Sequence, residues 1–222
     1  WGYEEVKTPG FEYADTFGSM VKDSDFRFFD RNNNLLVLRN DMTAPIARLA
    51  ATRLQQEAGS KRLCYFANLF RYEEIQMGRQ CEFEQAGVEF FGEQGAEADA
   101  EVIATGARIL KELGLTAVKL NINSIGCPNC RPKYHEKLKE YFAQHIDGMC
   151  EDCKARFEKN PLRLLDCKEE KCSAIAKNAP VVIEHLCDEC HDHFEGLKKT
   201  LDAMGVDYQI NTKIVRGLDY YT

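Results

Sequence analysis

Eight cysteines gathered in one stretch constrain the folding of this chain more than any other feature of its sequence. They lie within 64 residues, from Cys127 to Cys190, and only two further cysteines occur in the 222 residues. Extracellular disulfide frameworks are typical of small, loop-rich secreted domains. This chain is longer, and its 44% hydrophobic residues are enough for an ordinary core. We therefore expect reduced thiols that bind metal, in a cytoplasmic protein.

The spacing of the eight cysteines is typical of zinc sites. Structural zinc takes four ligands in a tetrahedron, often from paired Cys-x2-Cys segments about 15–20 residues apart. The spacing favours one site from Cys127, Cys130, Cys150 and Cys153, and a second from Cys167, Cys172, Cys187 and Cys190. Other pairings stay open, and His191 or His193 could replace a cysteine. The alternative is eight reduced cysteines without metal beside a helical core.

Charge and hydrophobicity exclude several classes of protein. No apolar run approaches the roughly 20 residues that a membrane span needs, so no membrane partner is expected. A net charge of −7 argues against a surface that binds nucleic acid everywhere, although it permits a local site. The chain starts at Trp1 and stops at Thr222 within an aromatic, strand-like run. We expect it to be part of a longer protein.

Patterns along the chain predict an α+β fold with a mainly antiparallel sheet flanked by helices. Strands are expected at 26–30, 35–39, 63–71, 83–91, 117–122, 208–215 and 218–221, and helices after 41, at 96–113 and at 134–142. The cysteine-rich, mostly helical part interrupts this pattern. We therefore predict a core in residues 1–126, an inserted domain in 127–199 and a return to the core in 200–222.

Polar side chains interrupt the apolar strand expected at 83–91. Period-two alternation places Gln85 and Glu89 on one face, which could also be an open, solvated face. Arg71 ends the preceding strand, and Arg79 lies in the loop between the two. Because guanidinium binds phosphate or carboxylate in a bidentate way, this set suits a ligand with both anionic and cationic groups.

The amino-acid sequences of several segments resemble those of the histidyl branch of the class II aminoacyl-tRNA synthetases. Residues 70–73 (Phe-Arg-Tyr-Glu), 78–79 (Gly-Arg) and 82–89 (Glu-Phe-Glu-Gln-Ala-Gly-Val-Glu) resemble motif 2 of that family. Residues 214–221 (Ile-Val-Arg-Gly-Leu-Asp-Tyr-Tyr) resemble its histidine-binding segment. Residues 7–12 resemble the end of motif 1, which forms the dimer interface in the family. The resemblance covers essentially the whole chain, which would then end before motif 3.

The resemblance implies that the protein is a histidine–tRNA ligase, which forms histidyl-adenylate from histidine and ATP. The residues implied to bind histidine are Asp41, Thr43, Gln85, Glu89, Tyr220 and Tyr221. Those implied to bind ATP are Arg71, Glu73, Arg79 and Arg216, with Arg71 and Arg216 also catalytic through charge stabilisation. Asp41 or Thr43 could instead simply cap a helix. The family also implies Mg²⁺ with ATP, a homodimer, and contact between the insertion and the tRNA(His) acceptor stem.

Three departures point to a paralogue of the family, the regulatory subunit of ATP phosphoribosyltransferase in histidine biosynthesis. The segment from Arg39 to Thr43 differs from the usual Arg-Pro-Glu-Gly-Thr, Cys81 replaces a usual Arg, and residues 16–28 are shorter than usual. That subunit binds histidine and partners the phosphoribosyltransferase catalytic subunit. It typically lacks the insertion and often the arginine at position 216, and this chain has both. We therefore predict the synthetase, with the regulatory subunit as the alternative. A third hypothesis, a zinc-organised adaptor, leaves the polar set unexplained.

Overall fold

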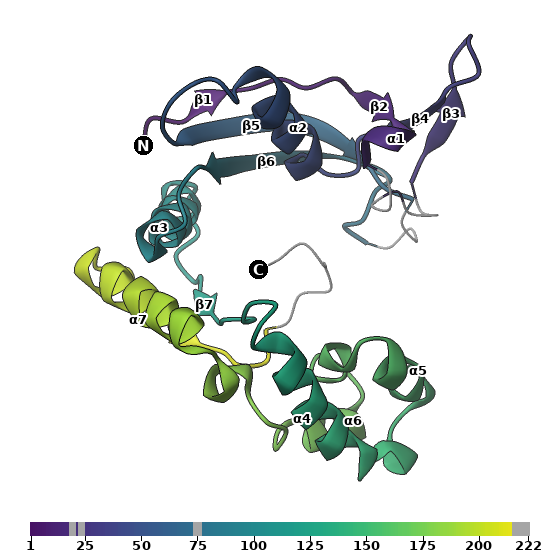
Figure 1. Cartoon of the computed structure of the whole chain (residues 1–222), viewed down its shortest axis with the longest axis vertical. Coiled ribbons are helices and arrows are strands. Elements are labelled where there is room, and N and C mark those ends of the chain that lie inside the picture. The colour runs from purple at the N-terminus through teal and green to yellow at the C-terminus, as the bar shows by residue number, and fades with distance from the viewer. Residues whose placement is uncertain (18–20, 22–24, 73–76, 215–222) are drawn as a thin grey trace. The chain divides into compact units, whose positions relative to one another are not determined.

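The computed structural model describes residues 1–17, 21, 25–72 and 77–214. The chain separates into two compact units, residues 1–94 and 95–222 (Figure 1). The first unit contains β1 (Glu4–Glu5), β2 (Phe11–Tyr13), α1 (Ala14–Phe17), β3 (Arg27–Phe29), β4 (Leu35–Leu38), α2 (Thr43–Arg53), β5 (Lys61–Phe70) and β6 (Glu82–Phe91). The second contains α3 (Ala96–Glu112), β7 (Asn121–Ile122), α4 (Arg131–Ala143), α5 (Glu151–Lys159), α6 (Glu170–Ala176), α7 (Asp188–Ala203) and β8 (Gln209–Ile210).

The strands β5 and β6 form the main antiparallel pair of the first unit, and β1 extends it as a parallel strand beside β5. Leu63, Tyr65 and Leu69 are buried at odd positions of β5, as alternation along a strand requires. They pack with Met42 and Ile46 at the start of α2. The pattern-based prediction of this strand pair and of the helix that precedes it is confirmed.

A second sheet of the first unit has the order β2-β4-β3, with antiparallel pairing throughout. The hairpin from β3 to β4 turns at Asn33, whose φ of 62° is in the left-handed region that Asn tolerates. The Asp30 carboxylate accepts the backbone N–H groups of Asn32 and Asn34, both at 2.8 Å. The hairpin predicted from the run of asparagines is therefore confirmed.

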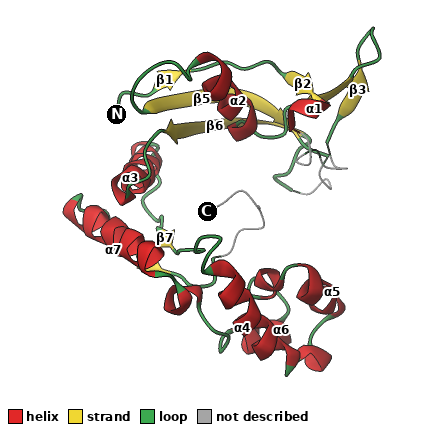
Figure 2. Ribbon diagram, in the orientation of Figure 1, coloured by secondary structure: helices red, strands yellow, loops and turns green. Residues whose placement is uncertain are grey.

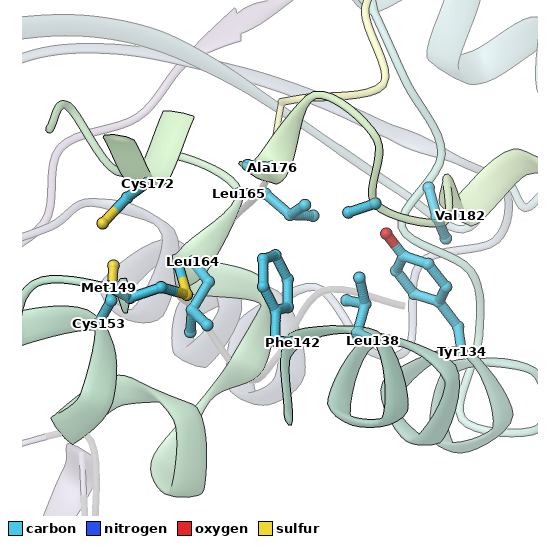
Figure 3. Packing of buried hydrophobic residues seen from close by; sticks show 11 residues of the cluster. Tyr134, Leu138, Phe142, Met149, Cys153, Leu164, Leu165, Cys172, Ala176 and Val182 are labelled. Atoms are coloured by element: carbon cyan, nitrogen blue, oxygen red, sulfur yellow. The ribbon is translucent and has the colours of Figure 1, made fainter. Parts of the chain in front are cut away.

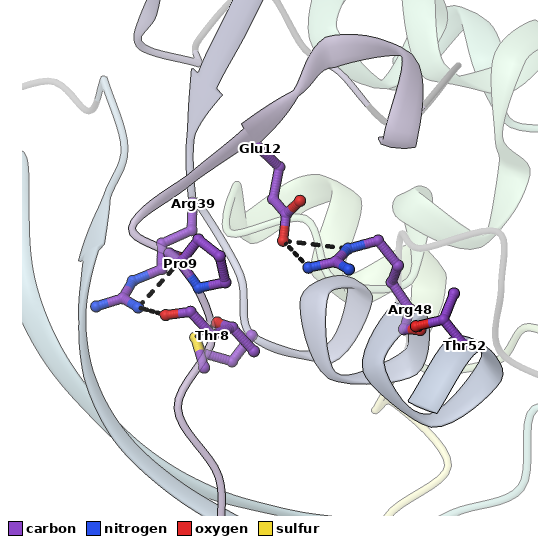
Figure 4. Close-up of polar contacts among 7 residues, drawn as sticks. Thr8, Pro9, Glu12, Arg39, Arg48 and Thr52 are labelled. Carbon is purple, nitrogen blue, oxygen red and sulfur yellow. Dashed lines mark hydrogen bonds and ion pairs between the residues drawn. The ribbon is translucent and has the colours of Figure 1, made fainter. Parts of the chain in front are cut away.

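Two arginines tie the segments of the first unit together (Figure 4). Arg39, at the end of β4, donates from Nε to the carbonyl oxygen of Asn68 at 2.7 Å and from a terminal nitrogen to that of Thr8 at 3.0 Å. Arg48 on α2 binds the buried carboxylate of Glu12 on β2. A buried carboxylate is costly without a partner, so the ion pair fixes α2 beside this sheet.

The second unit has two hydrophobic cores. The helix-pair core lies between α3 and α7 and contains Ala96, Ala100, Ile122, Phe194, Leu197 and Leu201. Gly196 allows the two helices to approach, because a Cβ there would lie 3.2 Å from the Cβ of Ala96. His193 and Asp99 join the same helices at 2.8 Å.

The insertion core lies among α4, α5, α6 and three short 3₁₀ helices, Ile146–Gly148, Pro161–Leu164 and Val182–His185 (Figures 2 and 3). Its buried members include Tyr134, Leu138, Phe142, Met149 and Leu164. The Tyr134 hydroxyl donates to the carbonyl oxygen of Pro180 at 3.0 Å, which satisfies a buried polar group. The mostly helical character predicted for this part is confirmed.

The strands at the edges of the second unit are shorter than predicted. Within the segments expected at 117–122 and 208–215, only β7 and β8 form, as a two-residue parallel pair. Leu115 and Val118 are exposed, and only Leu120 and Ile122, at and beside β7, pack on the helix-pair core, so the burial that would extend the strand is limited to its end. The strand expected at 218–221 lies outside the described residues.

Among the described residues, no helix combines the length and the apolar character that crossing a membrane requires.

Candidate functional site

The first cluster of polar residues lies on β6 and at the start of α2. Thr43 donates its hydroxyl hydrogen to Oε1 of Glu89 at 2.7 Å, although 46 positions separate the two residues. Asp41, which precedes the N-cap residue Met42, accepts the backbone N–H of Thr43 at 2.7 Å. The structure therefore brings Asp41, Thr43 and Glu89 together at the start of α2.

Burial raises the pKa of Glu89, the hydrogen bond from Thr43 partly offsets this, and the neighbouring Asp41 carboxylate raises it further. The carboxylate therefore lacks a cation among its described neighbours and would be stabilised by a positively charged or N–H-donating ligand. Gln85 lies four residues earlier on the same face. Within the described part of the chain, its buried Oε1 accepts no hydrogen bond. A buried acceptor of this kind is rare and suits a donor supplied by a ligand.

Arg71, directly after β5, is held in one orientation. Its Nε donates to the carbonyl oxygen of Asn40 at 2.7 Å, and its guanidinium lies 5.2 Å from the ring centre of Phe83. A terminal nitrogen is 3.8 Å from Asp41. Because Nε is already used, an anionic ligand would bind the two terminal nitrogens, one of which now faces Asp41.

Tyr65 belongs to the same site and was missed from the sequence. It lies opposite Gly87 in the strand register, and a Cβ at position 87 would be 2.3 Å from the Tyr65 hydroxyl oxygen. Burial, together with the negative charges of Glu89 and Asp41, raises the pKa of Tyr65 to about 12. Its hydroxyl therefore stays protonated and can donate a hydrogen bond near Glu89. The glycine in the middle of an apolar strand was the available signal.

The structure does not place the other predicted site residues in this cluster. Arg79 is exposed in the turn after Gly78, whose φ is +80°. Glu73, Arg216, Tyr220 and Tyr221 lie outside the described residues.

The eight clustered cysteines form two tetrads, each with its four sulfur atoms within 4.8 Å of one another. The outer tetrad is Cys127, Cys130, Cys187 and Cys190, and the inner tetrad is Cys150, Cys153, Cys167 and Cys172. All are free thiols. The predicted pairing was wrong, because the first and last Cys-x2-Cys segments meet each other and enclose the middle four cysteines. Sequence spacing records only local loops, whereas the helices of the insertion bring its two ends together.

The sulfur positions suit tetrahedral zinc. A tetrahedron with Zn–S bonds of about 2.3 Å has S···S edges of about 3.8 Å. In the outer tetrad the Cys127 Sγ lies 3.7 Å from those of Cys130 and Cys187. In the inner tetrad the Cys150 and Cys167 Sγ atoms are 3.9 Å apart.

Backbone N–H groups point at these sulfurs. Asn129 donates to the Cys127 Sγ at 3.3 Å, and Cys150 donates to the Cys172 Sγ at 3.3 Å. Hydrogen bonds from the backbone of Cys130 and Asn129 lower the pKa of Cys127 to about 6. Burial instead raises the pKa of Cys153 and Cys190. Four thiolates this close together repel one another unless a cation lies between them.

A family model described as histidyl-tRNA synthetase matches residues 1–222. The chain belongs to the histidyl-tRNA synthetase family. This confirms the resemblance found in the motifs, and with it the class II synthetase type of fold. The antiparallel pair β5–β6, with its polar face and its intervening loop, occupies the segment that resembles motif 2.

Curated relatives within the family are named histidine–tRNA ligases. The protein of Caldanaerobacter subterraneus subsp. tengcongensis is 46% identical over 230 residues, which cover 100% of this chain and 55% of that protein. The Clostridium kluyveri protein is 45% identical with the same coverage. The chain therefore spans about half the length of the curated relatives it matches.

Solved structures of synthetase relatives share the fold. Apo histidyl-tRNA synthetase of S. aureus superposes with a TM-score of 0.75 at 32% identity, over 99% of this chain and 51% of that one. A Bacillus halodurans protein titled ATP phosphoribosyltransferase regulatory subunit/histidyl-tRNA synthetase gives 0.64 at 30% identity, over 100% and 62%.

Proposed function

We propose that this chain carries the histidine- and ATP-binding part of a histidine–tRNA ligase, which activates histidine with ATP and transfers it to tRNA(His). The observation that carries the proposal is the polar face of β6, where Glu89 bonds to Thr43 and Gln85 has an unfilled buried acceptor, with Arg71 paired to the neighbouring Asp41. Identity of 43–46% over the whole chain to curated histidine–tRNA ligases supports it.

In the proposed site, each end of histidine meets a complementary group. The imidazole donates an N–H to Glu89, with Tyr220 and Tyr221 assigned to the same pocket from the family motif. The α-ammonium group donates to the unfilled Oε1 of Gln85 and to the carboxylate and hydroxyl of Asp41 and Thr43. A site built to accept these hydrogen bonds rejects analogues that lack the donors.

Arginines at the proposed site act on ATP by charge. Arg71 holds the α-phosphate and the histidine carboxylate in line, so that the carboxylate oxygen attacks phosphorus and pyrophosphate leaves. Glu73 and Arg79 are assigned to ATP binding, and Arg216 stabilises the charge that develops on the α-phosphate. Mg²⁺ is expected to enter with ATP, because phosphate oxygens supply most of its ligands.

The test of this function is histidine-dependent ATP–pyrophosphate exchange by the full-length protein. Arg216→Ala should reduce exchange by roughly 10²–10³-fold, the usual effect of deleting one preorganised charge-stabilising donor. Lys213→Ala, in the same segment but exposed, is the matched control and should exchange like wild type. Absence of exchange in the wild type, together with activation of an ATP phosphoribosyltransferase catalytic subunit, would instead establish the regulatory-subunit alternative.

Glu89→Gln should weaken histidine binding and stabilise the fold. Replacing a carboxylate that accepts an imidazole N–H should weaken binding roughly 10–100-fold. Because burial raises the pKa of Glu89, the folded chain binds its proton more tightly than the unfolded chain does. Wild-type stability therefore falls as the pH rises from the ordinary carboxyl pKa through the raised one.

Calorimetric histidine titration and unfolding at several pH values check both parts. The stability gain of Glu89→Gln should grow across that pH window. Glu84→Gln, on the opposite face of β6, is the control and should change neither quantity. Unchanged histidine affinity in Glu89→Gln would remove Glu89 from the proposed site.

The remaining parts of the proposal concern partners and location. We assign the core to residues 1–126 and 200–222 and the insertion to residues 127–199, where it would contact the tRNA acceptor stem. Residues 7–12 are assigned to a homodimer interface, as in the family motif. The protein is proposed to act in the cytoplasm, where its thiols stay reduced.

Structural Zn²⁺ completes the proposal for the insertion. Each tetrad offers four thiol ligands at distances that suit tetrahedral zinc and leave no open position for water. The metal would cross-link helix starts that are far apart in sequence. We assign it no catalytic step.

A further inference from the structure

The two tetrads join parts of the chain that are separated by different lengths of sequence. The outer tetrad takes its ligands from the start of α4 and from the start of α7, so it joins the two ends of the segment that holds α4, α5 and α6. Cys127 and Cys187 are 60 positions apart. The inner tetrad takes all four ligands from within that segment, where Cys150 and Cys167 are only 17 positions apart.

The tetrads also differ in their relation to the hydrophobic cores. Cys153 and Cys172 of the inner tetrad are buried members of the insertion core, with 0% and 1% exposure. Among the described residues, neither the insertion core nor the helix-pair core includes a cysteine of the outer tetrad. Ile183 packs against both cores, so the outer tetrad lies where the two are joined along the chain.

From this difference we infer that the two metals have separate structural roles. The inferred division rests on the zinc proposal above. The inner metal completes the insertion core and is needed for that core to fold. The outer metal links the start of α4 to the start of α7, and the insertion core stays folded without it.

Local geometry at the outer tetrad depends on Gly126. This residue has a φ of +68°, and a Cβ there would lie 2.7 Å from the Cys130 Sγ. Its carbonyl oxygen accepts a hydrogen bond from the Arg131 guanidinium at 2.9 Å. The chain therefore approaches Cys127 in a conformation that only glycine adopts without strain. An alanine at position 126 displaces a ligand sulfur of the outer tetrad and touches nothing in the inner one.

Native mass spectrometry and hydrogen exchange on zinc-loaded protein test the division. Wild type should hold two zinc ions, and Cys130→Ser and Gly126→Ala should each hold one. In both variants, amides of residues 191–194, the first to be hydrogen-bonded in α7, should exchange at least about tenfold faster, while those of α5 and α6 change less than about twofold. Cys153→Ser should also lose one zinc, but it should accelerate exchange throughout α4, α5 and α6.

Two control variants show whether loss of zinc is specific to the tetrad residues. Gly148→Ala, where a new Cβ meets no atom within 4 Å, and Cys64→Ser, outside both tetrads, should each keep two zinc ions. If wild type holds no zinc, the zinc proposal itself fails and the division fails with it. If wild type holds two, and Cys130→Ser either keeps both or exposes the amides of α5 and α6, the division alone is overturned.

Discussion

Stripping metal from both tetrads should unfold residues 131–186 while residues 1–94 stay folded. The insertion core is small, and a segment of fewer than about 60 residues buries too little apolar surface to be secure without a cross-link. Two of its most buried side chains, Cys153 and Cys172, are also proposed ligands of the inner metal. Structural zinc contributes an apparent binding free energy of about 10–16 kcal/mol in small zinc domains, which becomes folding free energy.

Circular dichroism and hydrogen exchange before and after chelator treatment, under reducing conditions, measure this effect. The helical signal should fall and return on addition of Zn²⁺ but not of Mg²⁺. Amides of β5 and β6 should keep their protection, because their unit contains no tetrad cysteine. Less than one zinc per chain after purification, with folding indifferent to chelator, would contradict the metal proposal.

Arg71→Ala should strongly reduce activation of histidine. The side chain is fixed by Asn40 and Phe83, so its terminal nitrogens are oriented before any ligand arrives. Loss of such a preorganised charge should reduce ATP–pyrophosphate exchange in the full-length protein by roughly 10²–10³-fold. Arg71→Lys should recover little of this, since a single ammonium group cannot reproduce the fork.

The matched control is Arg62→Ala. Arg62 lies on the same strand pair and also stacks on a ring, with its guanidinium 4.3 Å from the centre of Phe90. This variant should lose packing but keep exchange within a few-fold of wild type. If Arg71→Ala and Arg62→Ala behave alike, Arg71 acts through stability rather than through the phosphate, and unfolding curves of both variants would show it.

Local patterns predicted the first unit well because its elements are locally encoded. Alternation gave β5 and β6, the asparagine run gave the β3–β4 turn, and Asp41 with Pro45 gave the start of α2. The resemblance assigned Thr43 and Glu89 to one histidine site, and the structure joins the two side chains by a hydrogen bond.

Features that depend on tertiary contact were predicted less well. An aromatic residue in a strand is usually part of the core, so the sequence alone does not single out Tyr65. Its place in the site follows from the packing of its ring and hydroxyl against Gly87. The cysteine pairing failed for a similar reason, because adjacency along the chain carries no information about which helix starts converge. The strands β7 and β8 are short because only a few of the apolar residues around them, such as Leu120 and Tyr208, pack on the helix-pair core.

The nested arrangement of the tetrads has a consequence for synthesis on the ribosome. Among the eight clustered cysteines, the first four to emerge are Cys127, Cys130, Cys150 and Cys153, which is not a set that the folded chain brings together. At about 5–20 residues per second, Cys167 and Cys172 follow about a second or more later, and Cys187 and Cys190 later still. A zinc ion bound by the first four during synthesis would therefore have to exchange between thiols before either tetrad is complete.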